Sequence, residues 1–219
     1  MIRIPIAKEG YIFIVPLGFL VIVFWIFGWI FAGFLTSGFF IFVTYFFRDP
    51  EREIPNISNV IISPADGKVV EIITETDPFL NEPFKRISIF LNVFNVHINR
   101  APIAGRIEKV RYNPGKFLAA FNHKASLDNE QTAILFQNGE NKILVKQIAG
   151  LIARRIIYWP REGDQYKLGQ RFGLIRFGSR VDIFLPLSAK LNVTNGDHLA
   201  GGTSIIGFLG GSWCTATAS

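Results

Sequence analysis

The stretch GLIRFGSRVDIFLP, residues Gly173 to Pro186, decides the fold of most of this chain. Two apolar runs lie at its ends, and a small Gly178-Ser179 pair between two arginines separates them. A glycine inside a strand pattern usually marks a bulge or a place where another group approaches the backbone closely. The stretch therefore predicts β-structure with a bulge at the Gly-Ser pair.

Similar runs of β-branched and aromatic residues, divided by turn signals, continue outward and together cover Ile54 to about Leu209. Short runs of this kind, with no long stretch of helical periodicity, predict a sandwich or barrel that is mainly β. One segment interrupts the pattern, PGKFLAAFNHKASLDNE from Pro114 to Glu130. We expect this segment to form a loop or a short helix with a functional role.

The segment before this domain is a continuous apolar run, because no charged side chain occurs from Tyr11 to Phe47. A membrane-spanning helix needs about 20 apolar residues, so this run is too long for one span and short for two. A charged segment follows it, instead of the small-residue cleavage site of a signal peptide. The run therefore predicts a retained transmembrane or re-entrant helical anchor, with the break expected at Gly33, Ser37 and Gly38.

Residues 1–53 are thus predicted to be a membrane anchor with a linker, and residues 54–219 a folded domain. The net charge is +6, and no nucleic-acid-binding module is recognisable, so the expected partner is the anionic lipid surface of the cell membrane. Basic residues flank both ends of the apolar run, so the charge bias alone does not set its orientation. The single cysteine, Cys214, excludes an internal disulfide, and no metal-ligand spacing is present, so no metal is expected.

The candidate catalytic residues come from four separate segments. His97 ends a strand-like run, where a side chain can face a cleft, whereas His123 lies in the irregular segment and His198 in a turn open to solvent. Asp66 belongs to an Asp-Gly turn. Together with Ser179, the pair Asp66 and His97 offers a serine, a base and an orienting acid. Each also has a structural interpretation, as a hairpin turn for Asp66 and a buried, hydrogen-bonded side chain for His97.

The order of five motifs gives these residues a family context. The chain, from Met1 to about Leu209, resembles the short, membrane-anchored class of phosphatidylserine decarboxylase proenzymes. The motifs that carry the resemblance are SPADG (63–67), FNVHINRAP (94–102), VKQIAGLIARRI (145–156), GDQYKLGQRFGLIRFGSRVDIFLP (163–186) and GDHLAGGTSIIG (196–207). The tail from residue 210 to residue 219 matches nothing in the family.

The resemblance implies that the chain cleaves its own bond between Gly178 and Ser179. Ser179 would attack the Gly178 carbonyl, His97 would accept its proton and Asp66 would hold the imidazole. Ser179 would then become an N-terminal pyruvoyl group, which is the expected cofactor. This group would form a Schiff base with the amine of phosphatidylserine and accept the electrons left by carbon dioxide, giving phosphatidylethanolamine. The two fragments would remain together as a heterodimer, and a homo-oligomer is left open.

A phosphate headgroup is expected to bind basic side chains. Lys116, Lys124 and Arg180 are candidates for this contact, with a solvated surface charge as the alternative for each, and His123 is a further substrate-binding candidate. Members of the longer bacterial class have another histidine three places before the position of His97. This chain has Phe94 there, so the group that returns a proton to the substrate is left open between His97 and His123.

Two other classes of protein were weighed against this interpretation. A membrane-anchored serine hydrolase would use the same Asp66, His97 and Ser179, but the chain lacks the Gly-x-Ser-x-Gly elbow of that class. A biotinyl- or lipoyl-like binding module is suggested by GDHLAGGTSIIG, but the biotinyl domains need a Met-Lys pair and Met1 is the only methionine. The second similarity predicts a hammerhead-like β-structure in the C-terminal part rather than a carrier function.

Overall fold

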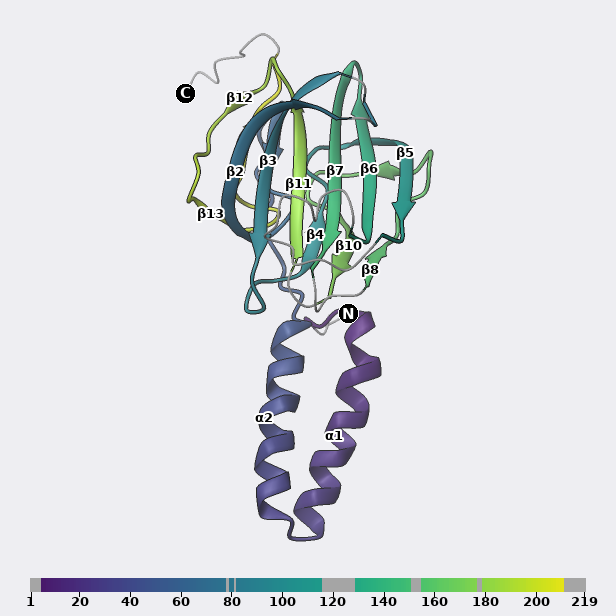
Figure 1. Ribbon diagram of the computed structural model, residues 1–219, viewed down its shortest axis with the longest axis vertical. Helices are drawn as coiled ribbons and strands as arrows, with labels where there is room; N and C mark the ends of the chain where they lie inside the picture. The colour runs from purple at the N-terminus through teal and green to yellow at the C-terminus, as the bar shows by residue number, and fades with distance from the viewer. Residues whose placement is uncertain are drawn as a thin grey trace.

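A helical hairpin and a β-rich domain make up the molecule. The computed structural model describes residues 5–77, 79–80, 82–115, 129–150, 155–176 and 179–210. Figure 1 shows two long helices that project side by side from one end of a domain built from strands. The predicted fold class, mainly β with an N-terminal helical anchor, is therefore confirmed.

The hairpin begins with a short 3-10 helix, η1 (Lys8–Gly10), which continues directly into α1 (Tyr11–Ile26). The second helix, α2 (Ile30–Phe46), runs back towards the domain. Gly28 forms the turn between them with a φ of 69°, a left-handed conformation that glycine adopts at little steric cost. The chain therefore enters and leaves the hairpin at the same end, next to the domain.

The break expected at Gly33, Ser37 and Gly38 is wrong, because all three residues lie inside α2. A Cβ atom at Gly33 would lie 3.3 Å from the ring of Trp25 in α1, so the missing side chain makes room for that ring. The Trp25 indole also donates a hydrogen bond of 3.3 Å to the Ser37 hydroxyl. Two of these small residues therefore serve the contact between the two helices, as small residues commonly do in membranes.

The dimensions of the hairpin suit a bilayer. The helical segment Lys8–Ile26 has 19 residues and a mean hydropathy of 2.1, which makes it long and apolar enough to cross a membrane. The 17 residues of α2 are about 26 Å long, slightly less than the roughly 30 Å of a hydrocarbon core. Large apolar side chains on both helices are exposed, among them Phe19 at 66% and Phe31 at 84%. These surfaces support membrane association.

The domain contains short and long strands that pair only with antiparallel neighbours among the described residues. The strands are β1 (Val60–Ile62), β2 (Gly67–Thr76), β3 (Pro83–Leu91), β4 (Ile98–Arg100), β5 (Gly105–Asn113), β6 (Gln131–Asn138), β7 (Asn141–Ala149), β8 (Ile156–Tyr158), β9 (Gln165–Tyr166), β10 (Arg171–Ile175), β11 (Ser179–Pro186), β12 (Lys190–Leu191), β13 (His198–Leu199) and β14 (Ile205–Phe208).

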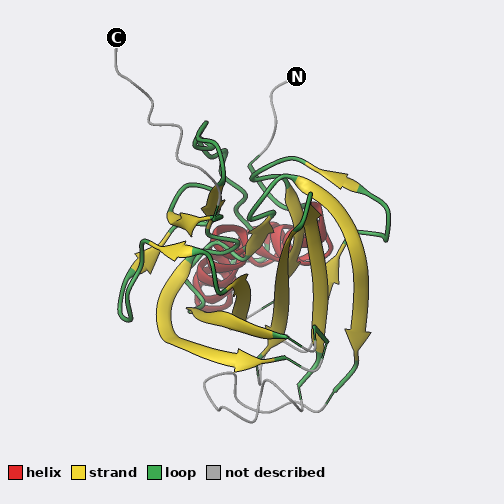
Figure 2. Cartoon of the chain, turned by 90° about the horizontal axis from the view of Figure 1, so that it is seen from above, coloured by secondary structure: helices red, strands yellow, loops and turns green. Residues whose placement is uncertain are grey.

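Three sheets form the layers of the domain. An eight-stranded sheet with the order β13-β2-β3-β11-β7-β6-β5-β9 curls around one side, as Figure 2 shows from above. Two three-stranded sheets, β1-β14-β12 and β4-β10-β8, complete the domain. The main apolar core includes Ile61 and Ile206 from one small sheet, Phe172 from the other, and Val145 and Ile183 from the large sheet. Antiparallel strands that alternate between this core and the outer face explain the β-pattern of the sequence.

A second apolar cluster joins the hairpin to the domain, and we call it the seam. Buried residues from the N-terminal segment and both helices meet buried residues from the 92–97 loop, β4 and β10. The members are Ala7, Ile14, Val43, Phe46, Phe47, Val96, Ile98 and Leu174. Backbone contacts reinforce the cluster, since Ala7 N–H donates to the Phe47 carbonyl at 2.8 Å. The seam fixes the end of the hairpin against the sheet β4-β10-β8.

Candidate active site

Ser179 is the first residue of β11, which lies inside the eight-stranded sheet. It pairs with Leu91 at the end of β3 on one side and with Ala149 at the end of β7 on the other. Its side chain is completely buried, and its hydroxyl has no hydrogen-bond partner among the described residues. A buried polar group without a partner costs about 1–3 kcal/mol, so such groups are rare outside functional sites. Gly178, before it, lies outside the described residues.

His97 lies between β3 and β4 and is 2% exposed. Its Nδ1 atom is 3.0 Å from the carbonyl oxygen of Asn95. Because a carbonyl only accepts hydrogen bonds, the neutral ring carries its proton on Nδ1 and leaves the lone pair on Nε2. Nε2 is buried and has no hydrogen-bond partner in the described part of the chain. The arrangement therefore presents Nε2 as a base.

The protonation of His97 is set by its surroundings. Burial lowers the pKa of His97 to about 4; the hydrogen bond to Asn95 acts against this shift, and the positive charge of Arg48 adds to it. The imidazole also packs against the ring of Phe46, the last residue of α2, in a tilted arrangement with ring centroids 4.3 Å apart. His97 is consequently neutral at physiological pH and able to accept a proton.

The chain itself connects His97 with Ser179. The carbonyl of His97 accepts a hydrogen bond of 3.3 Å from the N–H of Ile175, the last residue of β10. Ser179 follows four residues later, and four extended residues span at most roughly 14 Å. The peptide bond before Ser179 therefore lies in a short connection. This connection runs from Ile175, which is hydrogen-bonded to His97, to Ser179, which is paired with β3 and β7.

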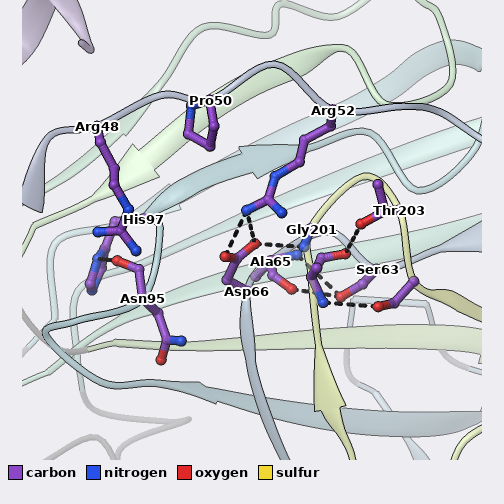
Figure 3. Close-up of polar contacts among 12 residues, drawn as sticks. Arg48, Pro50, Arg52, Ser63, Ala65, Asp66, Asn95, His97, Gly201 and Thr203 are labelled. Carbon is purple, nitrogen blue, oxygen red and sulfur yellow. Dashed lines mark hydrogen bonds and ion pairs between the residues drawn. The ribbon is translucent and has the colours of Figure 1, made fainter. Parts of the chain in front are cut away.

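Asp66 lies in the turn between β1 and β2 and has other partners. Its carboxylate accepts hydrogen bonds of 2.9 and 3.1 Å from the Arg52 guanidinium and one of 2.7 Å from the Gly201 N–H. Figure 3 shows Arg52 reaching Asp66 while Arg48, from the same linker, extends towards His97. The structure therefore connects Asp66 to the linker and not directly to His97. The role of Asp66 in orienting His97 stays a prediction.

The other predicted site residues are distributed widely. Arg180 is buried on β11 and its Nε lies 3.0 Å from the Asp182 carboxylate, so it has an internal partner. His198 is exposed at the start of β13, in agreement with a solvated side chain. Lys116, His123 and Lys124 lie outside the described residues. Within the described ranges, no group of three His, Cys, Asp or Glu side chains is placed to hold a metal ion.

Two buried amides near the site were missed in the sequence. The Gln147 side chain donates a hydrogen bond of 2.7 Å to Asn99, and both residues are completely buried. Asn99 in turn donates to the carbonyl of Pro64, in the turn that carries Asp66, at 3.4 Å. The amides therefore connect this turn to β7, where Gln147 pairs with Val181 of β11. The sequence feature that could have identified Asn99 and Gln147 is a polar residue within an apolar strand pattern, as in FNVHINRAP and VKQIAG.

Phe46, Arg48 and Arg52 were also missed, because the sequence assigns them to the anchor and its linker. The apolar run gave no reason to separate Phe46 from the lipid-facing residues of the same helix. The arginines look like the ordinary basic flank of a membrane segment. Only the return of α2 to the domain shows that Phe46 packs against His97, that Arg52 binds Asp66 and that the charge of Arg48 acts on His97.

Comparisons with known proteins show the family of this chain. The model of one protein family, phosphatidylserine decarboxylase, matches residues 39–207. The phosphatidylserine decarboxylase proenzyme of Geotalea uraniireducens (strain Rf4) is 44% identical over 208 residues, which cover 94% of this chain and 97% of the relative. The proenzyme of the same name from Syntrophus aciditrophicus (strain SB) is 46% identical over 207 residues, covering 92% and 96%. The chain therefore belongs to the phosphatidylserine decarboxylase family.

Proposed function

We propose that this chain is a proenzyme that cleaves itself between Gly178 and Ser179 and then decarboxylates phosphatidylserine at the bilayer surface. The observation that carries the proposal is the buried Ser179 hydroxyl, which has no hydrogen-bond partner among the described residues. It follows, four residues later, Ile175, whose N–H donates to the His97 carbonyl. The proenzyme names of the two relatives and their similarity over nearly the whole chain support it.

The first step uses His97 as the base. Nε2 accepts the proton of the Ser179 hydroxyl while Oγ forms a bond to the Gly178 carbonyl carbon. The carbon–nitrogen bond between Gly178 and Ser179 then breaks, and the proton passes to the departing nitrogen. Gly178 is now joined to the Ser179 side chain by an ester. Because Nε2 is buried and unprotonated, it needs no prior loss of a proton to begin this step.

The second step opens the ester by elimination. Removal of the proton on the Ser179 Cα breaks the bond between Cβ and Oγ, which releases Gly178 as a free carboxylate. Water then converts the remaining dehydroalanine end into a keto group and ammonia. The amino-terminal fragment would contain residues 1–178 and the carboxy-terminal fragment residues 179–219.

The position of Ser179 fits a pyruvoyl group. β11 pairs with β3 along all eight of its residues and with β7 along six of them, so these strands hold the new terminus after cleavage. When present, the pyruvoyl group supplies a carbonyl that condenses with the substrate amine and accepts the electrons released by decarboxylation. The complete burial of Ser179 keeps water away from that carbonyl.

The hairpin brings this site to its lipid substrate. Its two ends lie together at the base of the domain, so an inserted hairpin holds the domain against one face of the membrane (Figure 1). Lys8, Arg48 and Arg52 then flank that same face. Because basic residues favour the cytoplasmic side, we infer that the domain lies on the cytoplasmic face of the cell membrane.

Denaturing electrophoresis and intact mass spectrometry of the purified chain test the proposal. We expect fragments of 178 and 41 residues, the second number being 219 − 178. The shorter fragment should carry a keto group in place of its amine and should resist Edman degradation. Ser179→Ala should remain intact and release no carbon dioxide from phosphatidylserine. An intact, active wild-type chain, or an active Ser179→Ala variant, would contradict the proposal.

A further inference from the structure

Arg176 occupies a distinctive position between the domain and the hairpin. It follows β10 directly, and its N–H donates a hydrogen bond of 3.2 Å to the carbonyl of Arg155, just before β8. Its guanidinium carbon lies 5.1 Å from the ring centroid of Phe13, in the first turn of α1. Leu174, two residues earlier, packs into the seam on the same face of the strand. The Arg176 side chain is thus directed at the hairpin.

Neither of the two arginines has an anionic partner within hydrogen-bonding distance in the described part of the chain. Arg176 Nε is buried without a hydrogen-bond partner, and neither Arg176 nor Arg155 forms an ion pair with another described residue. Burial and the positive charge of Arg155 lower the pKa of Arg176, and Glu9 opposes this shift. The half-buried guanidinium of Arg176, with the positive charge of the exposed Arg155 close enough to act on it, suits an anionic oxygen ligand, which arginine binds with a planar set of donors.

The depth of the pair in the membrane indicates which anion is available. Phe13 is the third residue of α1, and the uncharged run begins at Tyr11, so this turn lies at the boundary of the hydrocarbon core. The lipid phosphates lie immediately outside that core. An anion between the hairpin and the domain at this level is therefore a phospholipid phosphate rather than a soluble metabolite.

We propose that Arg176 and Arg155 bind the phosphodiester of the phospholipid whose headgroup enters the site at Ser179. This assignment rests on the proposed function and adds to it the element that recognises the phosphate. Arg176 precedes Ser179 by three residues, a span of at most roughly 11 Å, which the guanidinium and the short serine headgroup can bridge between them. Arg180, the nearest arginine on the other side of Ser179, has its internal partner in Asp182.

The test uses the full-length protein in phosphatidylcholine vesicles that contain phosphatidylserine. Cleavage is measured first, and kcat and KM are then determined per cleaved chain. Arg155→Gln and Arg176→Gln should each raise KM roughly 10- to 100-fold, the loss expected for a hydrogen bond to a charged group, and change kcat little. Arg176→Lys should recover part of the loss, because it keeps the charge without the planar donors.

Arg161→Gln is the matched control, because it removes the same charge from an exposed turn. It should leave KM unchanged. A second substrate, a diacyl lipid with an uncharged carbonate in place of the phosphodiester, isolates the phosphate. The kcat/KM of the wild type should be lower on the carbonate lipid than on phosphatidylserine, by about the same factor as Arg155→Gln lowers kcat/KM on phosphatidylserine. On the carbonate lipid, Arg155→Gln and the wild type should have the same kcat/KM. Inorganic phosphate should not compete below millimolar concentration; effective competition would reassign the pair to free phosphate.

Several outcomes would overturn the inference. One is a KM for Arg155→Gln equal to that of Arg161→Gln. Another is a loss of kcat/KM in Arg155→Gln that is the same on phosphatidylserine and on the carbonate lipid. If Arg176→Gln fails to cleave, Arg155→Gln and Arg176→Lys decide the result, because Arg155 is exposed and its substitution leaves the fold intact. A wild-type chain that neither cleaves nor releases carbon dioxide would instead refute the proposed function. A wild type that does both, with unaltered arginine variants, would refute only the phosphate site.

Discussion

The hairpin and the β-domain place their apolar side chains in opposite directions. Ile26 and Phe31 of the hairpin are 74% and 84% exposed, whereas Ile61 and Phe136 of the domain are completely buried. The last residue of α2 differs from the exposed apolar residues of the hairpin, because Phe46 is only 1% exposed. A helix that served only as a tether would have no need to bury its last residue against a candidate catalytic histidine.

The difference shows where the two regions cooperate. His97 belongs to the domain but packs against Phe46 of the hairpin, and Asp66 belongs to the domain but accepts hydrogen bonds from Arg52 of the linker. Most of the hairpin exposes apolar side chains, and its final turn and the linker contact the candidate active site. The predictions below separate these two contributions, beginning with the proposed base.

Removal of the proposed base should have the largest effect. His97→Ala should slow self-cleavage by at least about 100-fold, since a positioned general base contributes roughly 100- to 10,000-fold. Pulse–chase synthesis of the full-length chain with lipid vesicles measures the rate. His198→Ala is the control and should cleave normally, because His198 is exposed on β13. Normal cleavage of His97→Ala would assign the base to another group, with His123 as the first candidate.

Loss of the linker contact should have a smaller effect. Arg52→Gln leaves the Asp66 carboxylate with the Gly201 N–H as its remaining partner, and we expect cleavage to slow about tenfold, equivalent to about 1.4 kcal/mol. Lys142→Gln removes an exposed ion pair with Glu108 at the opposite end of β7 from Ala149, the partner of Ser179, and should change neither cleavage nor stability measurably. Equal rates for the two variants would show that Arg52 belongs only to the anchor.

Exposure of the His97 ring to water should change the pH dependence of self-cleavage more than its maximal rate. The pKa of His97 is near 4 because the ring is buried, so wild-type cleavage should be constant from about pH 8 down to pH 5. Phe46→Ala admits water, raises this pKa towards 6.5 and should slow cleavage several-fold at pH 5.5, with little change at pH 8. Phe39→Ala, a lipid-exposed position in the same helix, should keep the wild-type profile. An identical profile for both variants would contradict a role for Phe46.

The sequence predicted those features that depend on local pattern. Short runs of β-branched and aromatic residues between turn signals identify the β-domain, and the uncharged run identifies the anchor. The position of the turn was missed because Gly28 and Gly33 look alike in sequence, although one forms a left-handed turn and the other makes room for Trp25. Only the packing of the two helices distinguishes these roles.

In the candidate site, too, the sequence predicted local features but not long-range contacts. Ser179 and His97 could be predicted from motifs, and both prove to be buried with one polar atom that lacks a partner among the described residues. The contacts of Phe46 and Arg52 could not be predicted, because they depend on how a hairpin of about 35 residues folds back onto the domain. Long-range contacts of this kind leave no periodic signal in either segment.

The smallest expected effect concerns the tip of the hairpin, far from the seam. Gly28→Ala should destabilise the hairpin by about 1 kcal/mol, because alanine is strained at a φ of 69° although no atom lies within 4 Å of the added Cβ. Gly38→Ala also meets no atom within 4 Å but lies inside α2, where alanine should stabilise the helix by about 1 kcal/mol. Thermal unfolding of the helices in detergent, followed by circular dichroism, should therefore shift in opposite directions. Both variants should cleave at the wild-type rate, because neither changes the contacts of Phe46 or Arg52. If Gly28→Ala slowed cleavage, the geometry of the tip would be transmitted to the site, and the division between lipid-contacting and site-forming parts of the hairpin would be wrong.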